Sequence, residues 1–383
     1  MLFYNARIFP VVGDVIPLGY IRTENSKIAE IASGTPENIS SEDIDCGGLT
    51  LMPGLIDSHS HLGFIGDGAG MEGDDVNEAS DPVTPQLRAI DGINFTDGYF
   101  KDAQRCGVTC AVTGCGSTNP IGGTFAAIKT AGRYIDEMVV ADCAVKFALG
   151  ENPKSCYSDR DESPMTRMAT AAVIREALYT AKRYMLDKAA AEEDDGDMPD
   201  FDMKSEALIP LLRREVKAHF HCHRADDIMT AVRLAEEFEL DYVLIHCTEG
   251  YLIADVLGEK KVCANVGPII CDRGKPELAR LSVKNAAELY KHGVKISVCT
   301  DHPEVPLDYL AASAAFCVKA GLPSEEAVRA ITINAAEITG IESRVGSLEV
   351  GKDADMILVD GDILDVMTNV VMTVIDGKIV YRS

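Results

Sequence analysis

Short apolar runs alternate with amphipathic helical patterns through the middle of the chain, and this alternation limits the possible folds more than any other feature. The runs cover residues 109–112, 143–149, 218–222, 242–245 and 294–299. A helix is expected over residues 226–239, where apolar side chains recur at helical spacing. Alternation of this kind over roughly 250 residues is what a (β/α)8 barrel, the TIM barrel, requires. A doubly wound open sheet is the structural alternative.

The two ends of the chain have a different pattern, made of short strands. Near the N-terminus strands are expected over residues 2–9, 20–22 and 27–31, and near the C-terminus over residues 355–359, 370–375 and 378–381. The pair Asp376-Gly377 between apolar runs predicts a β-hairpin. We therefore expect residues 1–51 and 345–383 to form one small discontinuous sheet domain and residues 52–344 to form the barrel.

Two segments interrupt the alternation. Residues 114–123 are rich in glycine and are expected to form a tight strand-to-helix turn; the alternative is that their backbone amides approach a ligand, although the segment lacks the lysine of a phosphate-binding loop. Residues 189–202 carry a dense run of Asp and Glu, which is more typical of a solvated loop than of an active-site lid.

Charge and cysteine usage restrict the partners and the compartment. The net charge of -25 disfavours nucleic-acid and membrane binding, because both require clustered Lys and Arg, so a small-molecule substrate is expected. The sequence leaves a homo-oligomer possible. Its 12 cysteines are scattered, often within apolar stretches, and no apolar run reaches the length of a membrane span. The N-terminal segment lacks the pattern of a signal peptide, so a cytoplasmic protein is expected.

Histidines mark the ends of several expected strands. Of the eight histidines, six lie in three places: the pair at 59 and 61, the cluster at 219, 221 and 223, and the single residue at 246. Residues two apart on a strand point to the same side, so His59 and His61 can reach one metal ion. Parallel strands of a barrel end on one face, which makes a metal site more plausible than three unrelated groups of core histidines.

Two further polar residues fit the same face. Asp301 follows the apolar run that ends near residue 299, and Lys146 lies inside the run over residues 143–149. A lysine beside a cationic site would be repelled unless its amine were converted to an anionic carbamate that bridges two metals. A solvent-facing lysine is the alternative interpretation.

Five motifs together resemble the amidohydrolase superfamily of metal-dependent hydrolases, in particular its imidazolonepropionase-like and Xaa-Pro dipeptidase-like branch. The motifs are PGLIDSHSH at 53–61, GENPK at 150–154 after Lys146, HCHRADDI at 221–228, TDHP at 300–303 and GSLEVGKDAD at 346–355. The resemblance spans nearly the whole chain. It implies a barrel that carries the metal site and a small β-sandwich domain formed by both chain termini.

The resemblance also implies a role for each candidate residue. By this comparison, His59 and His61 bind the more buried metal, Lys146 is the carboxylated bridging lysine, His221 and His246 bind the second metal, and Asp301 is a metal ligand that also moves protons. His223 is the rival of His221, and some branches use one metal without the bridging lysine. His219 is expected to be a structural or supporting residue.

The expected function is metal-dependent hydrolysis of a C–N bond in an amide, a cyclic amide or a dipeptide, with Asp301 as general base and acid. Zinc is the expected cofactor, one or two per chain, with iron or manganese as alternatives. A mononuclear heterocycle deaminase and a non-catalytic scaffold are the competing hypotheses. Four residues are candidates to line the substrate pocket: His223, Arg224, His302 and Tyr157. Arg224 is equally well explained by an ion pair with Asp226 or Asp227.

Overall fold

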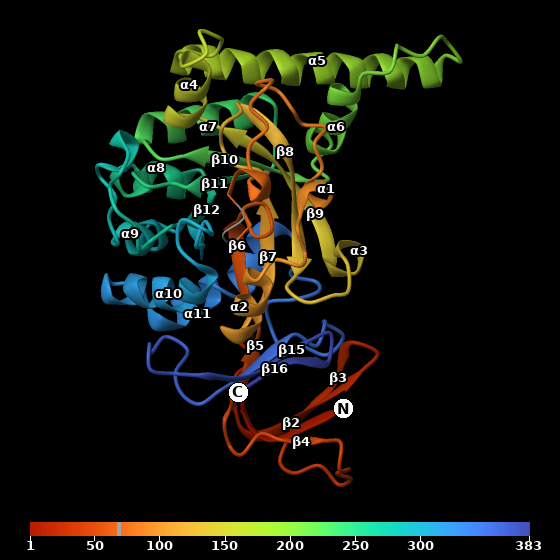
Figure 1. Ribbon diagram of the computed structural model, residues 1–383, viewed down its shortest axis with the longest axis vertical. Coiled ribbons are helices and arrows are strands. Elements are labelled where there is room, and N and C mark those ends of the chain that lie inside the picture. Colours follow the sequence, from red (N-terminus) through yellow and green to blue (C-terminus); the bar gives the residue numbers. More distant parts are fainter. Residues whose placement is uncertain (67–69) are drawn as a thin grey trace.

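Eight strands in the middle of the chain form a nearly closed barrel in the computed structural model, which describes residues 1–66 and 70–383 (Figure 1). Their order in the sheet follows the sequence: β6 (Leu55–Ser60), β7 (Val108–Gly114), β8 (Ile121–Lys129), β9 (Val139–Ala148), β10 (Lys217–Cys222), β11 (Tyr242–His246), β12 (Cys263–Val266) and β13 (Lys295–Val298). The barrel expected from the alternating pattern is therefore confirmed, and the open doubly wound sheet is wrong.

One strand departs from the parallel arrangement. β8 pairs antiparallel with both β7 and β9, so β7 and β8 are joined directly, without a helix between them. The expected strand-to-helix turn over residues 114–123 is wrong, because this segment connects two strands. Its glycines allow close packing: a Cβ on Gly114 would lie 2.4 Å from the ring of Phe125, and one on Gly122 would lie 2.7 Å from Cys115 Sγ.

The barrel is closed between its first and last strands by contacts just beyond β13. The backbone N–H of Asp301 donates to the carbonyl of His59 at 3.1 Å, and the N–H of His61 donates to the carbonyl of His302 at 2.8 Å. The buried carboxylate of Asp57 accepts hydrogen bonds from the backbone N–H and the hydroxyl of Thr300. These contacts fix the spacing between His59 and Asp301.

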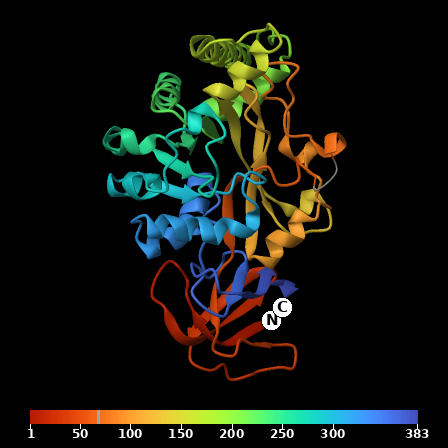
Figure 2. The same ribbon diagram turned by 60° about the vertical axis from the view of Figure 1, so that its left-hand side comes forward.

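Helices cover one flank of the barrel (Figure 2). They include α4 (Glu151–Ser158), α7 (Ala225–Glu237), α8 (Ala254–Glu259), α9 (Asn285–Lys291), α10 (Leu310–Lys319), α11 (Ser324–Ala330) and α12 (Ile333–Thr339). The expected helix over 226–239 corresponds to α7, which buries Ile228, Ala231 and Val232 against the sheet. This apolar stripe explains why the helix forms there.

The acidic segment over residues 189–202 is only partly a loop. α5 (Arg167–Glu193) begins after Thr166, whose hydroxyl caps the N–H of Ala169, and it continues through the first acidic residues. The chain then runs without regular structure to α6 (Met203–Leu212), where Asp202 is the N-cap. Figure 1 shows α5 crossing the end of the barrel opposite the chain termini.

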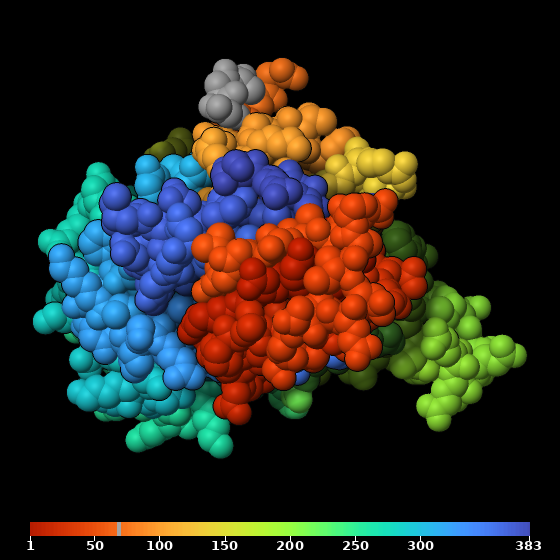
Figure 3. All heavy atoms as spheres, turned by 90° about the horizontal axis from the view of Figure 1, so that it is seen from below, coloured from red at the N-terminus to blue at the C-terminus, as the bar shows by residue number. Residues whose placement is uncertain are grey.

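Both ends of the chain contribute to a second sheet, as expected. Its order is β16 (Lys378–Arg382), β15 (Val370–Ile375), β14 (Met356–Val359), β5 (Thr50–Pro53), β1 (Leu2–Ile8), β2 (Ile16–Glu24) and β3 (Lys27–Ser33), with β4 (Ile44–Asp45) paired to β1. Figure 3 shows the N-terminal segment, in red, beside the C-terminal segment, in dark blue, on this face. The expected hairpin at Asp376-Gly377 joins β15 to β16.

A buried lysine connects the two sheets. Lys129 ends β8 and is 1% exposed, and its Nζ lies 2.9 Å from Asp353 and also forms an ion pair with Asp355. Asp353 and Asp355 immediately precede β14 in the terminal sheet.

Within the described residues, the structure contains no helix both long enough and apolar enough to cross a membrane.

Candidate metal centre

A cavity of about 450 Å³ opens where several barrel strands end. Five of the residues singled out in the sequence line it: His61, His221, His223, His246 and Asp301. They follow or end β6, β10, β11 and β13, strands that are far apart in the sequence. Convergence at the carboxyl ends of parallel strands, the basis of the sequence argument, is the reason they meet.

The carboxylate of Asp301 lies among three imidazoles. Its Oδ1 is 3.4 Å from His61 Nε2 and 3.6 Å from His59 Nε2, and its Oδ2 is 4.0 Å from His246 Nε2. His59, His246 and Asp301 each offer a ligand atom, and these atoms all lie within 4.8 Å of one another. Spacing of this kind suits a shared cation better than direct hydrogen bonds, which need shorter distances.

Lys146 and His59 are fully buried next to this group. Lys146 Nζ lies 3.0 Å from His59 Nε2 and 5.1 Å from the centre of the Phe125 ring, on which His59 stacks. Burial lowers the pKa of the Lys146 amine to about 8. The sequence therefore places a lysine where its charge is costly and its neutral form is favoured.

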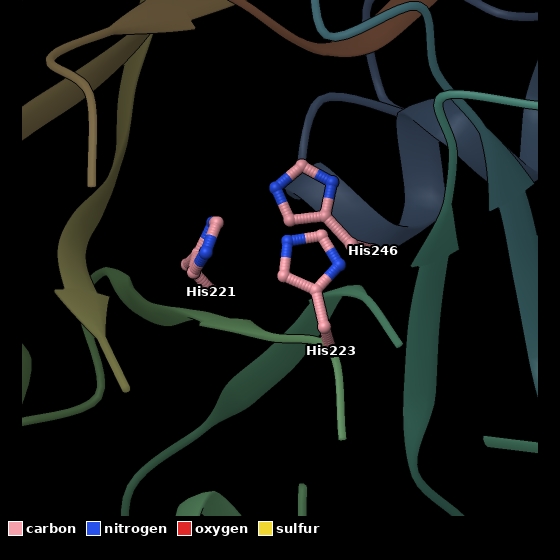
Figure 4. A group of neighbouring side chains, drawn as sticks. All are labelled: His221, His223 and His246. Atoms are coloured by element: carbon pink, nitrogen blue, oxygen red, sulfur yellow. The ribbon is translucent and has the colours of Figure 1, made fainter. Parts of the chain in front are cut away.

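His221, His223 and His246 form a second group of ligand atoms within 4.8 Å of one another (Figure 4). Their ring centres are 4.6 to 4.7 Å apart. The rings of His223 and His246 are stacked with an interplanar angle of 6°, whereas His221 is edge-on to both. A metal lies near the plane of each imidazole that binds it, so the edge-on rings of His221 and His246 suit a shared ion better than the stacked rings of His223 and His246.

Hydrogen bonds from the protein orient these rings. The Nδ1 of His61 lies 2.8 Å from the carbonyl of Gly114, and the Nδ1 of His246 lies 2.7 Å from the carbonyl of Gly267. Each of these bonds requires a proton on Nδ1 and leaves Nε2 free, which is a common way to fix the tautomer of a metal-binding histidine. His223 Nδ1 instead meets the hydroxyl of Thr248 at 2.7 Å.

Burial sets the protonation states that metal binding needs. It lowers the pKa of His59, His221 and His246 well below the usual value. For Asp301, burial raises the pKa, but His246 and His61 outweigh it and lower the pKa below that of an ordinary carboxyl. Neutral imidazoles and an ionised carboxylate are the forms that bind divalent cations.

An unpaired buried oxygen is a further indication that the residues fit a cation. Asp301 Oδ1 lies between Nε2 of His59 and Nε2 of His61, is buried, and has no hydrogen-bond partner among the described residues. Buried polar atoms are normally paired, and those left unpaired in a native protein commonly mark a bound ion or water. The donor set of imidazole nitrogens and carboxylate oxygens is suited to zinc, iron or manganese.

Three candidate pocket residues are placed elsewhere. Tyr157 is fully buried and its hydroxyl donates to Asn119 Oδ1 at 2.6 Å. Arg224 forms two hydrogen bonds with Asp226, the alternative that the sequence left open. His302 is 1% exposed and packs edge-on against Tyr99. None of these three lines the cavity, because each is taken up by a local partner.

The structure also brings in Asn152 and Lys275, which the sequence did not indicate as pocket residues, together with Ser117 of the glycine-rich segment 114–123. One wall of the cavity contains Ser117, Asn152 and Lys275, linked by hydrogen bonds from Asn152 to Ser117 and from Lys275 to Asn152. Behind the histidines lies the buried carboxylate of Glu277. These residues follow no apolar run that ends in a ligand type, so no strand-end signal marked them.

His219 lies in the barrel interior rather than at a strand end. It occupies the middle of β10, opposite Lys146 of β9, and its ring lies 6.4 Å from that of His59. Burial lowers the pKa of His219 to about 3.

The model of the amidohydrolase family matches residues 50–380. An amidohydrolase from Thermotoga maritima MSB8 has a solved structure with a TM-score of 0.96 and 39% identity, and the match covers 100% of both chains.

Two named relatives match by sequence. Amidohydrolase tasK from Hapsidospora irregularis is 29% identical over 390 residues, which is 94% of this chain but only 39% of tasK. An imidazolonepropionase from Brucella suis is 24% identical over 394 residues, covering 94% of this chain and 92% of that protein. The chain therefore spans well under half of the first relative and nearly all of the second.

Proposed function

Because this chain belongs to the amidohydrolase family, hydrolytic enzymes that act on carbon–nitrogen bonds, we propose that its cavity binds divalent metal and hydrolyses an amide, a cyclic amide or a dipeptide. The observation that supports this most is the position of Asp301, whose carboxylate lies within 4.0 Å of Nε2 of three imidazoles.

Six residues would hold the metal. His59 and His61 with Asp301 would bind one ion, and His221 and His246 would bind a second, with carboxylated Lys146 between them. His221 is preferred to His223 because its ring is edge-on to that of His246, an arrangement that suits a shared ion better than the stacked rings of His223 and His246. Zinc is the preferred ion, and iron or manganese would also suit these ligands.

Carboxylation of Lys146 would complete the bridge. The neutral amine nitrogen attacks the carbon of carbon dioxide, an N–C bond forms as one C–O π bond opens onto oxygen, and the nitrogen releases a proton to solvent, which gives an anionic carbamate. This reaction needs the neutral amine, whose share increases because burial lowers the pKa of Lys146 to about 8. A carbamate would also replace a cation with an anion beside the metal ligands.

When bound, the divalent cations would lower the pKa of the attacking water and polarise the scissile carbonyl. Asp301 would accept the proton of that water through its carboxylate, which the neighbouring imidazoles keep ionised. It would then donate the proton to the leaving nitrogen, which departs as a neutral amine. The cavity wall at Ser117, Asn152 and Lys275 would orient the substrate.

The test is to load the purified protein with zinc, manganese or iron and screen dipeptides, N-acyl amino acids and cyclic ureides. The proposal would be supported if the protein releases an amine from one of these substrates, if a chelator stops this release, and if added metal restores it. A protein that binds metal tightly but hydrolyses none of these classes, while releasing ammonia from heterocycles, would contradict it.

That second outcome is the alternative function, a mononuclear heterocycle deaminase. The observation in its favour is that His59, His246 and Asp301 alone offer three ligand atoms within 4.8 Å of one another, enough for a single ion. Counting metal ions per chain separates the two functions, because one ion with an unmodified Lys146 favours the deaminase.

A cytoplasmic location and a homo-oligomer remain predictions. Cell fractionation tests the location, and size-exclusion chromatography tests the oligomeric state.

A further inference from the structure

A buried carboxylate faces the histidine group from behind. Glu277 lies in the short helix η3 (Pro276–Leu278), is 2% exposed, and does not line the cavity. Its Oε1 is 3.7 Å from His223 Nε2 and 4.0 Å from His221 Nε2, and it has no hydrogen-bond partner among the described residues. An ionised oxygen without a donor is costly in a buried place, so this position needs an explanation.

The local backbone holds this carboxylate in place. Glu277 Oε2 accepts the N–H of Glu151 at 2.9 Å, and the N–H of Glu277 donates to Glu151 Oε2 at 3.3 Å. The preceding residue, Gly150, has a φ of +88°, and a Cβ there would lie only 2.8 Å from Glu277 Oε2. The segment after β9, the strand that carries Lys146, thus directs the other oxygen, Oε1, towards the histidines.

His221 offers an unpaired nitrogen that could pair with this oxygen. Its Nε2 is buried and has no hydrogen-bond partner within the described part of the chain. His223 differs, since its Nδ1 already meets Thr248 and its ring is stacked on His246. A small approach of His221 Nε2 to Glu277 Oε1 would satisfy both unpaired atoms at once.

We propose that Glu277 is a positioning residue of the metal centre, which accepts a hydrogen bond from Nε2–H of His221 and so leaves Nδ1 of His221 to bind metal. The inference rests on the proposed metal-dependent function. His221 would then differ from His61 and His246, whose Nδ1 atoms are held by backbone carbonyls and whose Nε2 atoms are free. A carboxylate behind a ligating imidazole fixes its tautomer and raises its basicity.

The first measurement is metal affinity. Glu277→Gln keeps the shape and one oxygen acceptor but removes the charge, and Glu277→Leu removes the acceptor. We expect zinc affinity to fall about 10-fold for Gln and up to about 100-fold for Leu, in line with other residues that support metal ligands. The matched control is Glu304→Gln, which removes an exposed carboxylate from the same cavity and is expected to leave zinc affinity within about two-fold.

The second measurement reads the binding nitrogen directly. In zinc-loaded protein labelled with heavy nitrogen in its histidines, long-range proton–nitrogen NMR correlations distinguish a ring bound through Nδ1 from one bound through Nε2. We expect Nδ1 binding for His221, assigned by its loss in His221→Asn, and Nε2 binding for His61 and His246. If Glu277 only supported folding, it would not determine which ring nitrogen of His221 binds zinc.

Two results would overturn the inference. One is Nε2 binding by His221 in the unaltered protein, and the other is unchanged zinc affinity in both folded Glu277 variants. Failure of the unaltered protein to bind any metal is a separate outcome, since it would contradict the proposed function together with the role of Glu277. Thermal unfolding of each variant shows whether it is folded before its affinity is compared.

Discussion

Lys146 Nζ lies 3.0 Å from His59 Nε2, and both side chains are fully buried in the barrel. The two residues come from β9 and β6, and no local sequence signal joins them. The contact places a basic group against a candidate metal ligand, which is unfavourable for a charged lysine and favourable for a neutral or carboxylated one.

Carboxylation of Lys146 is therefore the first prediction. Metal-loaded protein treated with bicarbonate should be heavier by one carbon dioxide per chain in native mass spectrometry, and peptide mapping should locate the addition at Lys146. Lys146→Met should abolish the mass increase. Lys204→Met is the control, because Lys204 forms a partly exposed pair with Asp81, and its replacement should leave both the fold and the mass increase intact. An unmodified mass in the fully metal-loaded protein would contradict the bridge.

Asp301→Asn should separate metal binding from catalysis. The amide keeps an oxygen near the imidazoles but cannot take a proton, so we expect metal to stay bound and turnover to fall by about 100-fold or more. Metal content by elemental analysis and turnover under saturating substrate check the two parts. Asp272→Asn, which removes an exposed carboxylate from the cavity lining, is the control and should cost far less. Full turnover in Asp301→Asn would eliminate the proposed proton transfer.

Lys129→Met should destabilise the protein strongly. The change leaves Asp355 buried without its cation and removes one of the three cations around Asp353, and loss of one partner from a buried ion pair typically costs about 3–5 kcal/mol. Urea denaturation measures the free energy of unfolding of each variant. The control is Lys204→Met, which breaks the exposed pair with Asp81 and should cost about 0–1 kcal/mol. Equal losses of unfolding free energy in Lys129→Met and Lys204→Met would contradict a larger contribution of the buried ion pairs to stability.

The same group should make stability depend on acid pH. Burial raises the pKa of Asp353, but Lys129 and Lys27 outweigh it and lower the pKa to about 2. The ionised carboxylate thus stabilises the folded protein fully above about pH 4, near the unfolded pKa, and this contribution is lost as the pH falls towards 2. Urea unfolding from pH 6 to pH 2 should show the stability gap between the unaltered protein and Asp353→Asn narrowing on acidification. A constant gap would contradict the assignment.

Much of the fold follows from local patterns. The apolar runs predicted β7, β9, β10, β11 and β13, and the Asp376-Gly377 pair predicted the last hairpin. These elements depend on side-chain periodicity and turn chemistry, which the sequence displays directly. The reversed strand β8 was missed because a buried strand has the same composition whichever way it runs.

The residues of the candidate site also fall into two groups, those that the sequence indicated and those that only the structure identified. His59, His61, His246 and Asp301 were indicated because a ligand type stands where an apolar run ends, and parallel strands bring such ends together. His221 was preferred to His223 because it follows the apolar run more directly and by resemblance to the family, but the sequence left His223 as a rival. The stacking of His223 on His246 and the position of Glu277 behind His221 are tertiary facts.

The sequence by itself thus determined the barrel, the sheet of joined termini and the chemical types that meet at the cavity, because periodicity and strand ends are local properties. Only the tertiary structure decided the orientation of each imidazole, the burial of Lys146 and the place of Glu277. These depend on contacts such as Glu151 with Glu277, which join residues 126 positions apart and leave no periodic trace in the chain.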